Sequence, residues 1–242
     1  MDLIRIFQKL THKVGVSIRP YTAATHPDKR LANSLKYFDI DLILDIGANV
    51  GQFAQSVLDN GYSGKIISFE PIKNCHEKLT QKAKSVKNWV IYDQGAIGSK
   101  EEWVEINISK NSVSSSILGI KKAHIEGEPD SKYIAKEKVK VRRLDDVIRA
   151  EDFSKKIFIK IDVQGFEMEV LKGGQNVLNQ ASLVSIELSL VPMYENNGII
   201  YTDVIKYMED HGFYLFGVQT GFVNKETGQV LQADGLFAKK DN

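Results

Sequence analysis

Short apolar runs alternate along the chain with stretches of helical periodicity. The runs at residues 42–46, 65–69 and 89–92 are typical of buried strands, and helices are expected between them from about residue 53 to 58 and from 75 to 84. Two later strands are expected at 157–161 and 183–188, with a helix over residues 167–178 between them. Strands that alternate with helices favour crossover connections and therefore a mainly parallel sheet.

The carboxyl-terminal part of the chain has a different pattern. The apolar runs at 213–216 and 235–238 flank a turn-rich segment at 225–228, so they are expected to form an antiparallel pair. A further segment of alternating apolar residues, 103–108, follows the sequence GSK at 98–100 and suggests an added hairpin. Nothing in the sequence marks an interdomain linker, and we expect one α/β domain over residues 41–242.

Residues 1–40 are predicted to form a helical extension that packs on this domain. Five apolar positions near the start of the chain fall on one helical face, namely Leu3, Ile6, Phe7, Leu10 and Val14. A contact in a homodimer or with a membrane surface is the alternative use of that face. The chain nowhere approaches the roughly 18 consecutive apolar residues of a membrane span, and charges interrupt its first residues. We therefore expect a cytoplasmic protein without a membrane span.

Composition narrows the range of functions. Of the 242 residues, 43% are apolar and 26% are charged, an ordinary balance for a globular protein with a core. Lys and Arg number 32 against 31 Asp and Glu, so the net charge of +1 argues against nucleic acid as a partner. The single cysteine, Cys75, excludes an internal disulfide, and the five histidines show no paired ligand spacing, so no metal site is expected from them. A divalent metal shared by Asp162 and Glu187 stays an open alternative.

The segment DIGANVG at 45–51 carries the strongest chemical signal. It follows the first predicted strand and opens a helix, and its glycines allow a tight turn and a close approach of the backbone to a ligand. A dinucleotide fingerprint, G-x-G-x-x-G, would hold a pyrophosphate here, but the pattern is D-x-G-x-N-x-G instead. The acidic residue at the strand end, Asp45, would repel a pyrophosphate and suits an ammonium group.

A second acidic residue, Glu70, ends the next predicted strand, about twenty residues after the glycine turn, where a carboxylate can accept hydrogen bonds from both hydroxyls of a ribose. Together the two residues describe a site for a nucleoside that carries an amino acid and no phosphates, which is the chemistry of S-adenosylmethionine. Two alternatives stay open. A nicotinamide-dependent oxidoreductase would need the glycine that is absent, and an ordinary strand–helix turn with a solvated Glu would need no ligand at all.

Three segments carry a resemblance to a known family. They are LDIGANVG at 44–51 with FEP at 69–71, SSSIL at 114–118, and IKIDVQGFE at 159–167 continuing to VLKGG at 170–174. Over about residues 40–190 the chain resembles the FkbM family of class I methyltransferases. The resemblance implies an α/β fold with a seven-stranded, mostly parallel sheet, an antiparallel C-terminal strand and helices on both faces. It also implies S-adenosylmethionine-dependent O-methylation of a hydroxyl in a sugar, a glycan or a natural product.

The same resemblance suggests which residues bind the cofactor. Asp45 is expected near the ammonium group, Glu70 at the ribose, and the turn at residues 93–96 near the adenine. The expected cofactor-binding residues are Asp45, Gly47, Asn49, Gly51, Glu70, Pro71, Asp93, Gln94, Ala96 and Asp162. The family pattern commonly has Glu at the position of Gln164, so no catalytic role is assigned there.

Three residues are candidates for catalysis. Asp162 ends a predicted strand at the same sheet edge as Asp45 and Glu70, and is expected to position the acceptor or support it electrostatically; an Asp that caps the next turn is the alternative. Glu187 interrupts an otherwise apolar strand and is the favoured general base, with His124 in reserve. Glu167, at the start of a helix, is explained equally well by the helix dipole.

The remaining polar features are less specific. The serine run at 114–116 is expected either in a loop near the acceptor or in a polar turn, and the basic segment at 136–143 is either a solvated face or a contact for an anionic acceptor. The expected partner is a small-molecule or glycan acceptor, with a homodimer as a further possibility. A domain that binds a glycan or a partner without catalysis is the non-enzymatic hypothesis.

Overall fold

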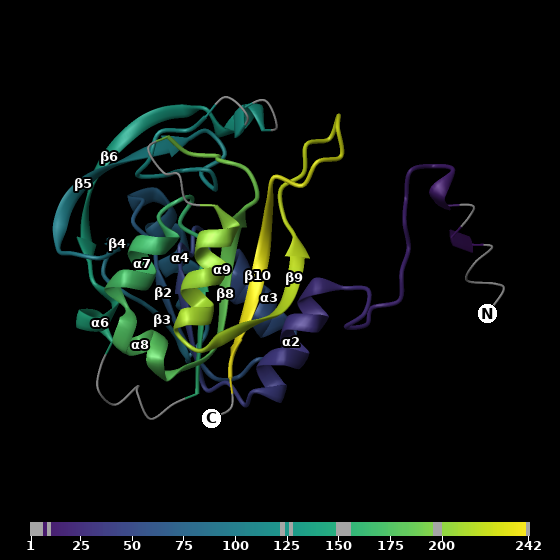
Figure 1. Ribbon diagram of the computed structural model, residues 1–242, viewed down its shortest axis with the longest axis horizontal. Coiled ribbons are helices and arrows are strands. Elements are labelled where there is room, and N and C mark those ends of the chain that lie inside the picture. The colour runs from purple at the N-terminus through teal and green to yellow at the C-terminus, as the bar shows by residue number, and fades with distance from the viewer. Residues whose placement is uncertain are drawn as a thin grey trace.

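A seven-stranded sheet forms the centre of the computed structural model, which describes residues 7–8, 11–121, 124–125, 128–148, 156–195 and 200–240. The strands lie in the order β3-β2-β1-β7-β8-β10-β9 (Figure 1). The first five in this order are parallel, whereas β10 runs antiparallel to both β8 and β9. The strands are β1 (Leu42–Ile46), β2 (Lys65–Phe69), β3 (Trp89–Ile91), β7 (Ile157–Ile161), β8 (Ala181–Ser189), β9 (Phe213–Thr220) and β10 (Gln232–Lys239). All seven predicted strands are confirmed.

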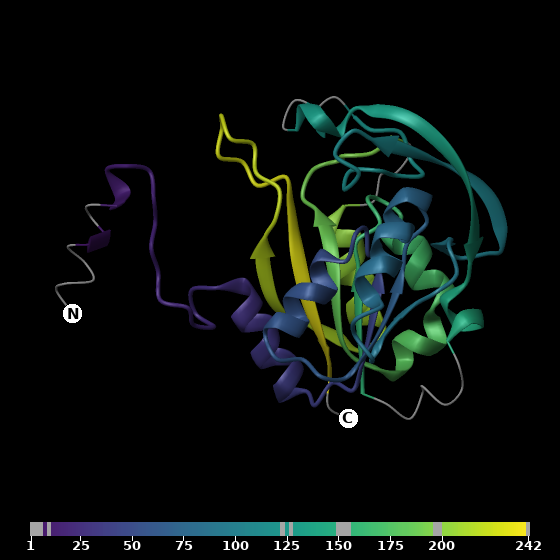
Figure 2. The ribbon, with the colours of Figure 1, turned by 180° about the vertical axis from the view of Figure 1, so that it is seen from behind.

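Helices cover both faces of this sheet (Figures 1 and 2). On one face lie α2 (Pro27–Tyr37), α3 (Gln52–Asp59) and α4 (Lys73–Ala83), packed on apolar side chains such as Ile43 and Phe158. The other face is covered by α6 (Leu144–Val147), α7 (Glu167–Gly173), α8 (Gln175–Gln180) and α9 (Tyr201–Asp210). Successive side chains of a strand point to opposite faces, so strands covered on both sides are mostly apolar.

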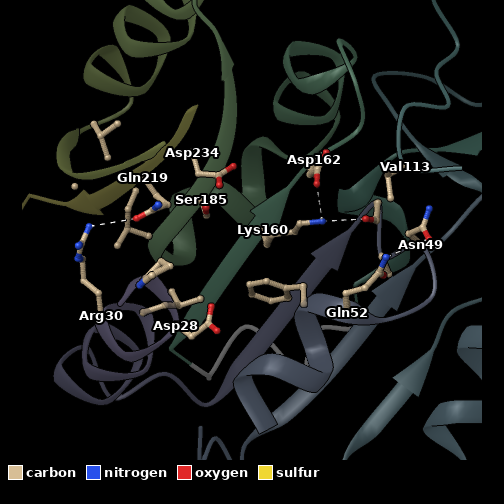
Figure 3. Close-up of a pocket in the computed structure, with 18 residues that line it drawn as sticks. Asp28, Arg30, Asn49, Gln52, Val113, Lys160, Asp162, Ser185, Gln219 and Asp234 are labelled. Carbon is tan, nitrogen blue, oxygen red and sulfur yellow. Dashed lines mark hydrogen bonds and ion pairs between the residues drawn. The ribbon is translucent and has the colours of Figure 1, made fainter. Parts of the chain in front are cut away.

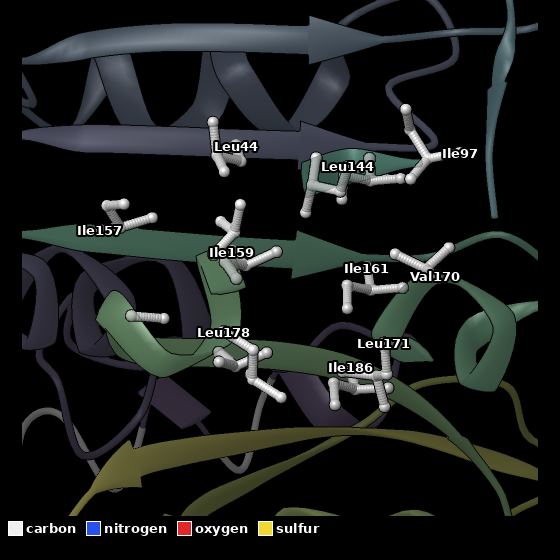
Figure 4. Close-up of a cluster of buried hydrophobic side chains, with 14 of the residues drawn as sticks. Leu44, Ile97, Leu144, Ile157, Ile159, Ile161, Val170, Leu171, Leu178 and Ile186 are labelled. Atoms are coloured by element: carbon white, nitrogen blue, oxygen red, sulfur yellow. The ribbon is translucent and has the colours of Figure 1, made fainter. Parts of the chain in front are cut away.

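The second of these faces contains the larger core cluster. Leu44, Ile159 and Ile186 come from three adjacent strands and pack against Val170 and Leu171 of α7 (Figure 4). The prediction of a single helix over residues 167–178 is wrong in one respect, because the structure has two helices there, α7 and α8, which meet at Gly174. A Cβ at Gly174 would lie 2.9 Å from Leu144 Cδ2, so the glycine leaves room for that side chain. Adjacent glycines also weaken a continuous helix.

A second, three-stranded sheet has the order β4-β6-β5. It contains β4 (Ala96–Ile97), β5 (Glu102–Ser109) and β6 (Tyr133–Arg142), with a short 3-10 helix η1 (Pro129–Ser131) before β6. The predicted strand at 103–108 is confirmed, but a hairpin closed across residues 98–100 is wrong. β6 lies between β4 and β5 and pairs antiparallel with β5. The pairing is long-range, so the local turn sequence could not reveal it.

The segment before α2 extends away from the sheet in both ribbon views (Figures 1 and 2). Of the five residues on the expected helical face, Phe7 is 57% and Val14 is 75% exposed, while Leu3, Ile6 and Leu10 lie outside the described residues. Within residues 27–40, Leu31 and Leu35 of α2 pack on the core. None of the described helices is both long and apolar enough to span a membrane.

Candidate functional site

The turn after β1 lies at the carboxyl edge of the sheet, where β1 and β7 approach most closely. Gly47 has φ +79°, and its N–H donates to the carbonyl of Phe69 at 3.1 Å. A Cβ at this position would overlap the backbone carbonyl of Asp162, so only glycine fits. Gly51, with φ +80°, packs against the ring of Trp89 in the same way, below the turn. The backbone conformation and the close packing of the turn therefore require glycine at both positions.

Glu70 follows β2 and holds this turn in place. Its Oε2 accepts a hydrogen bond from the backbone N–H of Asn49 at 2.7 Å, and its Oε1 accepts one from Ile72 at 2.8 Å. The side chain is only 3% exposed. This burial raises the pKa of Glu70 to about 7, although the two backbone donors oppose the shift. A small change in its surroundings near neutral pH therefore changes its charge.

A small cavity of about 60 Å³ opens beside Glu70. Pro71 and Ile72 line it on one side and Ala96 and Ile97 on another, while Gly47 and Asp162 close the end toward β1 and β7. Segments around residues 106–117 and 162–166 complete the walls. Of the residues expected to bind a cofactor, the lining residues are Gly47, Glu70, Pro71, Ala96 and Asp162.

The other expected cofactor residues lie around this cavity rather than in its wall. Asp93 and Gln94 are exposed next to it, and the Gln94 amide donates to the carbonyl of Pro71 at 2.9 Å. Asn49 lines the larger cavity described below and donates from its side chain to Ser112 Oγ at 3.2 Å. Asp45 has no exposed surface, so it reaches the site only through its neighbours.

The main neighbour of Asp45 is Lys160, a residue that the sequence interpretation did not single out. Its Nζ lies 3.5 Å from Asp45 Oδ1 and 3.4 Å from Asp162 Oδ2, and it donates to the carbonyl of Gly47 at 2.9 Å. Burial alone would lower the pKa of Lys160, but Asp162 and Asp45 outweigh it and raise the pKa. Ser68 donates to the second oxygen of Asp45 at 3.1 Å. The lysine thus links the strand ends of β1 and β7 electrostatically.

Gln164 connects the two carboxylates that the sequence proposed for catalysis. It follows β7 with φ +56°, and its Nε2 lies 2.8 Å from Asp162 Oδ1 and 3.0 Å from Glu187 Oε2. The hydroxyl of Tyr194 donates to Gln164 Oε1, and Gln232 Nε2 donates to Glu187 Oε2 at 2.8 Å. Burial, then the charges of Asp162 and Glu167, raise the pKa of Glu187 well above its ordinary value.

Glu167 shapes the turn between β7 and α7. Its Oε1 accepts backbone hydrogen bonds from Val163 at 3.2 Å and Gly165 at 3.0 Å. The side chain is 7% exposed, and this burial raises its pKa to about 7. These contacts explain an acidic residue here without a direct contact to a ligand.

A larger cavity of about 370 Å³ meets the small one at Gly47, Val113 and Asp162 (Figure 3). From there it runs past Lys160, over Ser185 of β8 and Asp234 of β10, toward α2 and β9. Its volume is in the range of small-molecule sites. At one sheet edge the structure therefore brings together two connected cavities, one beside the Glu70 carboxylate and one lined by both polar and apolar residues.

The sequence profile of the FkbM methyltransferase domain matches residues 45–215, which includes β1, Glu70, Asp162 and Glu187. The chain belongs to the FkbM methyltransferase family. The sheet order around this site, with its single antiparallel strand β10, is the class I methyltransferase arrangement that the sequence predicted.

Two curated relatives are similar in sequence. The hexuronic acid methyltransferase AglP of Haloferax volcanii is 25% identical over 148 residues, which cover 61% of this chain and 56% of the relative. The match thus spans little more than half the length of that protein. The 2-O-methyltransferase NoeI of Sinorhizobium fredii is 27% identical over 207 residues, covering 80% of this chain and 81% of the relative.

Among solved structures, an uncharacterised protein of Listeria monocytogenes serotype 4b has a similar fold. The TM-score is 0.50 at 10% sequence identity, and the match covers 90% of this chain and 69% of that chain. At this identity the likeness concerns the fold of the FkbM domain alone.

His124, the reserve candidate for a base, lies apart from both cavities of the FkbM domain. It is 3% exposed, and its ring packs between those of Tyr194 and Phe222, with centroid distances of 5.6 and 5.5 Å. Burial lowers its pKa to about 4, and among the described residues none makes a hydrogen bond with its Nδ1. A neutral ring between two aromatic side chains is typical of a structural histidine.

The serine run and the basic segment have ordinary structural partners. Ser116 Oγ donates to the carbonyl of Gln164 at 2.6 Å, and Ser115 Oγ accepts from the Ser109 N–H at 3.0 Å, so the serines hold a polar turn against the site. On β6, Lys136 pairs with Glu105 at 3.3 Å, and Lys140 pairs with Glu101. Within the described parts of the chain, no three His, Cys, Asp or Glu side chains gather as metal ligands would.

The sequence did not identify four residues that line the larger cavity, namely Arg30, Ser185, Gln219 and Asp234. Asp234 opens into the cavity, and no described residue makes a hydrogen bond or ion pair with its carboxylate. Desolvation by the cavity walls, and then the charge of Asp162, raise its pKa to about 6. Its one sequence signal is an acidic residue immediately before the predicted strand at 235–238, which is too common to be informative.

Proposed function

We propose that this protein transfers a methyl group from S-adenosylmethionine to a hydroxyl of a sugar or glycan. The observation that carries the proposal is Glu70, a buried carboxylate directly above the glycine turn and beside a small, mostly apolar cavity. A carboxylate at this place suits ribose hydroxyls, and Pro71 and Ile72 offer apolar surface for an adenine ring. The family match over residues 45–215 supports the same chemistry.

The cofactor residues fall into two groups in this proposal. Glu70, Pro71 and Ala96 hold the adenosine part, with Asp93 and Gln94 at the rim. Gly47, Asn49 and Asp162 lie where the two cavities meet, and hold the amino-acid end and the reacting methyl. Asp45 contributes through Lys160, whose contacts to Asp162 and to the carbonyl of Gly47 keep this junction in one geometry. Gly51 contributes through its packing below the turn.

When bound, the sulfonium of S-adenosylmethionine supplies an activated methyl group for in-line displacement by an oxygen. The protein's part is to align the acceptor hydroxyl with that methyl and to take up its proton, which contributes roughly 10²–10⁴-fold to such a step. Three carboxylates are close enough to one another to compete for this proton: Asp162, Glu187 and Asp234. Glu187 already accepts hydrogen bonds from two amides, whereas the Asp234 carboxylate has no such contact from the described residues.

A sugar acceptor is supported by the relatives and by the larger cavity. AglP is a hexuronic acid methyltransferase, and NoeI is a 2-O-methyltransferase. In this chain the cavity beyond Asp162 offers carboxylate, amide and hydroxyl groups together with the apolar side chains of Leu31, Phe53 and Leu236. That mixture suits the hydroxyls and the C–H face of a sugar ring. A homodimer and a cytoplasmic location stay predictions.

The cofactor part of the proposal is tested by titrating S-adenosylhomocysteine into Glu70→Ala. Loss of the ribose hydrogen bonds should cost about 1–3 kcal/mol, or about ten- to a hundredfold in affinity. Glu77→Ala, which removes an exposed carboxylate on α4, is the matched control and should bind like the wild type. Unchanged affinity in a folded Glu70→Ala protein would remove Glu70 from the site.

Catalysis is tested by mass spectrometry for methylated products after incubation with a panel of sugars and glycans. With a competent acceptor, Asp162→Asn, Glu187→Gln and Asp234→Asn are compared for turnover, with Asp210→Asn on α9 as an exposed control. The variant that loses turnover while keeping its affinity for S-adenosylhomocysteine identifies the proton acceptor. Binding of S-adenosylhomocysteine without any methylated product would favour the non-catalytic alternative.

A further inference from the structure

Polar side chains form one row across the carboxyl edge of the sheet. β7 and β8 are in register at Ile161 and Ile186, so the next residues, Asp162 and Glu187, lie side by side. Glu187 is directly opposite Asp234, and Asp234 is directly opposite Gln219. Four neighbouring strands therefore each place one polar residue at the same level. We call the row Asp162–Glu187–Asp234–Gln219 the edge row.

The edge row continues beyond the sheet to α2. Arg30 lies beside Gln219, with its Nη1 3.5 Å from Gln219 Oε1, and its Nε donates to the carbonyl of Ala23 at 3.1 Å. Figure 3 shows the order of the labelled side chains, from Asp162 past Asp234 and Gln219 to Arg30. All four of these residues line the larger cavity. The methyl-transfer end and Arg30 are thus opposite ends of one continuous space.

The length of the row limits what can occupy it. Neighbouring strands are about 4.8 Å apart, so Asp162 and Gln219 are separated by three spacings, or about 14 Å. A single sugar ring is shorter than this. An acceptor whose hydroxyl lies at Asp162 and which also reaches Arg30 must therefore extend over more than one ring, or carry a substituent of similar length.

The charge at the far end indicates the chemistry of that extension. The Arg30 guanidinium is partly buried, and no carboxylate of the described residues lies within ion-pair distance of it. Its two contacts, a carbonyl and an amide oxygen, leave the charge itself without a counter-ion. A planar guanidinium with free donors is well suited to hold a carboxylate or a phosphate by two parallel hydrogen bonds.

We propose that the three residues of the edge row that line the larger cavity, Asp162, Asp234 and Gln219, form the acceptor subsite together with Arg30, and that the acceptor is an extended saccharide with an anionic group held by Arg30. This inference rests on the proposed function, because it takes the bound saccharide to be the acceptor of the methyl group. The shared chemistry is an anion at a distance from the methylated hydroxyl, and either a sugar carboxylate or a sugar phosphate supplies it. Asp234 and Gln219, between the two ends, accept and donate hydrogen bonds to the intervening hydroxyls.

The test is direct binding to the protein saturated with S-adenosylhomocysteine. Calorimetry or saturation-transfer NMR compares cellobiose with cellobiouronic acid, which differ by one carboxylate, and with cellobiose 1-phosphate. We expect the wild type to bind at least one of the anionic probes about ten times more tightly than cellobiose, since a charge-assisted hydrogen-bonded pair is typically worth that much. Whether the carboxylate or the phosphate is preferred distinguishes the two sources of the anion.

Arg30→Gln should abolish this preference, while Arg30→Lys should retain part of it. Arg19→Gln, at an exposed arginine outside the cavities, is the matched control and should behave like the wild type. Affinity for S-adenosylhomocysteine in each variant reports correct folding. No preference for either anion, or a preference that survives in Arg30→Gln, would overturn this inference. If S-adenosylhomocysteine still binds in that case, the proposed function is unaffected. Failure to bind S-adenosylhomocysteine would instead remove the proposed function, and this inference with it.

Discussion

Replacing Lys160 by Met isolates the contribution of the buried charge pair below the glycine turn. Met is similar in length and apolar, so it keeps the packing beside Phe53, whose ring centroid lies 5.8 Å from Lys160 Nζ. Asp45 would remain fully buried, with Ser68 as its hydrogen-bond donor but without its cation. Asp162 is 39% exposed in its side chain and can be solvated instead. The cost should therefore come mainly from Asp45.

The magnitude follows from the distance between Lys160 Nζ and Asp45 Oδ1, which is 3.5 Å. At an effective dielectric constant of about 20, two unit charges at this separation attract by about 5 kcal/mol. Removing one partner of a buried pair typically destabilises a protein by about 3–5 kcal/mol, because the other charge stays desolvated. We expect Lys160→Met to lower the free energy of unfolding by that amount at neutral pH.

Urea unfolding followed by circular dichroism measures this difference. The matched control is Lys156→Met, because Lys156 also pairs at 3.3 Å, but with the exposed Asp39, and such surface pairs contribute at most about 1 kcal/mol. The double variant Asp45→Asn with Lys160→Met should recover most of the loss, since an amide needs no counter-charge.

The pH dependence has a defined sign. Burial already raises the pKa of Asp45, and loss of Lys160 raises it further, so the penalty is present above the folded-state pKa. It disappears as the pH falls toward about 4, the pKa of an unfolded Asp, and the two unfolding curves should converge there. A loss below about 1 kcal/mol at neutral pH, or a double variant no more stable than the single one, would refute this reasoning.

Two further predictions concern the cofactor side of the site. The pKa of Glu70 is raised to about 7 and ribose hydroxyls bind its ionised form, so affinity for S-adenosylhomocysteine should fall as the pH drops through about 7. Calorimetry should show this fall in the wild type and a flat pH profile in Glu70→Gln. An equal pH dependence in both proteins would assign the titration to another group. Gly47→Ala should lose cofactor binding and stability, since the new Cβ overlaps the backbone of Asp162 in addition to the roughly 1–2 kcal/mol cost of a left-handed residue. Gly61→Ala, with φ +91° and open space around it, should show the cost of the left-handed conformation alone. Equal effects of the two substitutions on stability would contradict the close approach at Gly47.

The residues proposed to hold the cofactor could be inferred from the sequence because they follow strands that are themselves easy to recognise. Runs such as residues 42–46 and 65–69 are mostly apolar, since both faces of a parallel strand are buried, and an acidic residue that follows such a run, as Glu70 does, must lie at the sheet edge. Glycine at a turn with φ near +80°, as at Gly47, and acid at the end of the next strand are local signals. For these residues, position along the chain already specifies position in space.

The acceptor half depends on strand pairing, which no local pattern specifies. Asp234 and Gln219 come to lie in one row with Asp162 only because β10 inserts antiparallel between β8 and β9. Arg30 joins them only because α2 packs over the same face of the sheet, and β5 finds its partner β6 across more than twenty intervening residues.

Burial also changes the roles that were expected from the sequence for two residues. Asp45 was recognised as the acid of the glycine turn, but its complete burial beside Lys160 makes it a support for the turn, with no surface left for a ligand. His124 was a candidate base, and its place between two aromatic rings lowers its pKa to about 4. Charge state and accessibility depend on every neighbour packed around a group, and those neighbours come from distant parts of the chain. The sequence by itself thus determined the strands, the glycine turn and the place of the Glu70 carboxylate beside it, whereas the tertiary structure decided which polar groups share one cavity and which charges they carry.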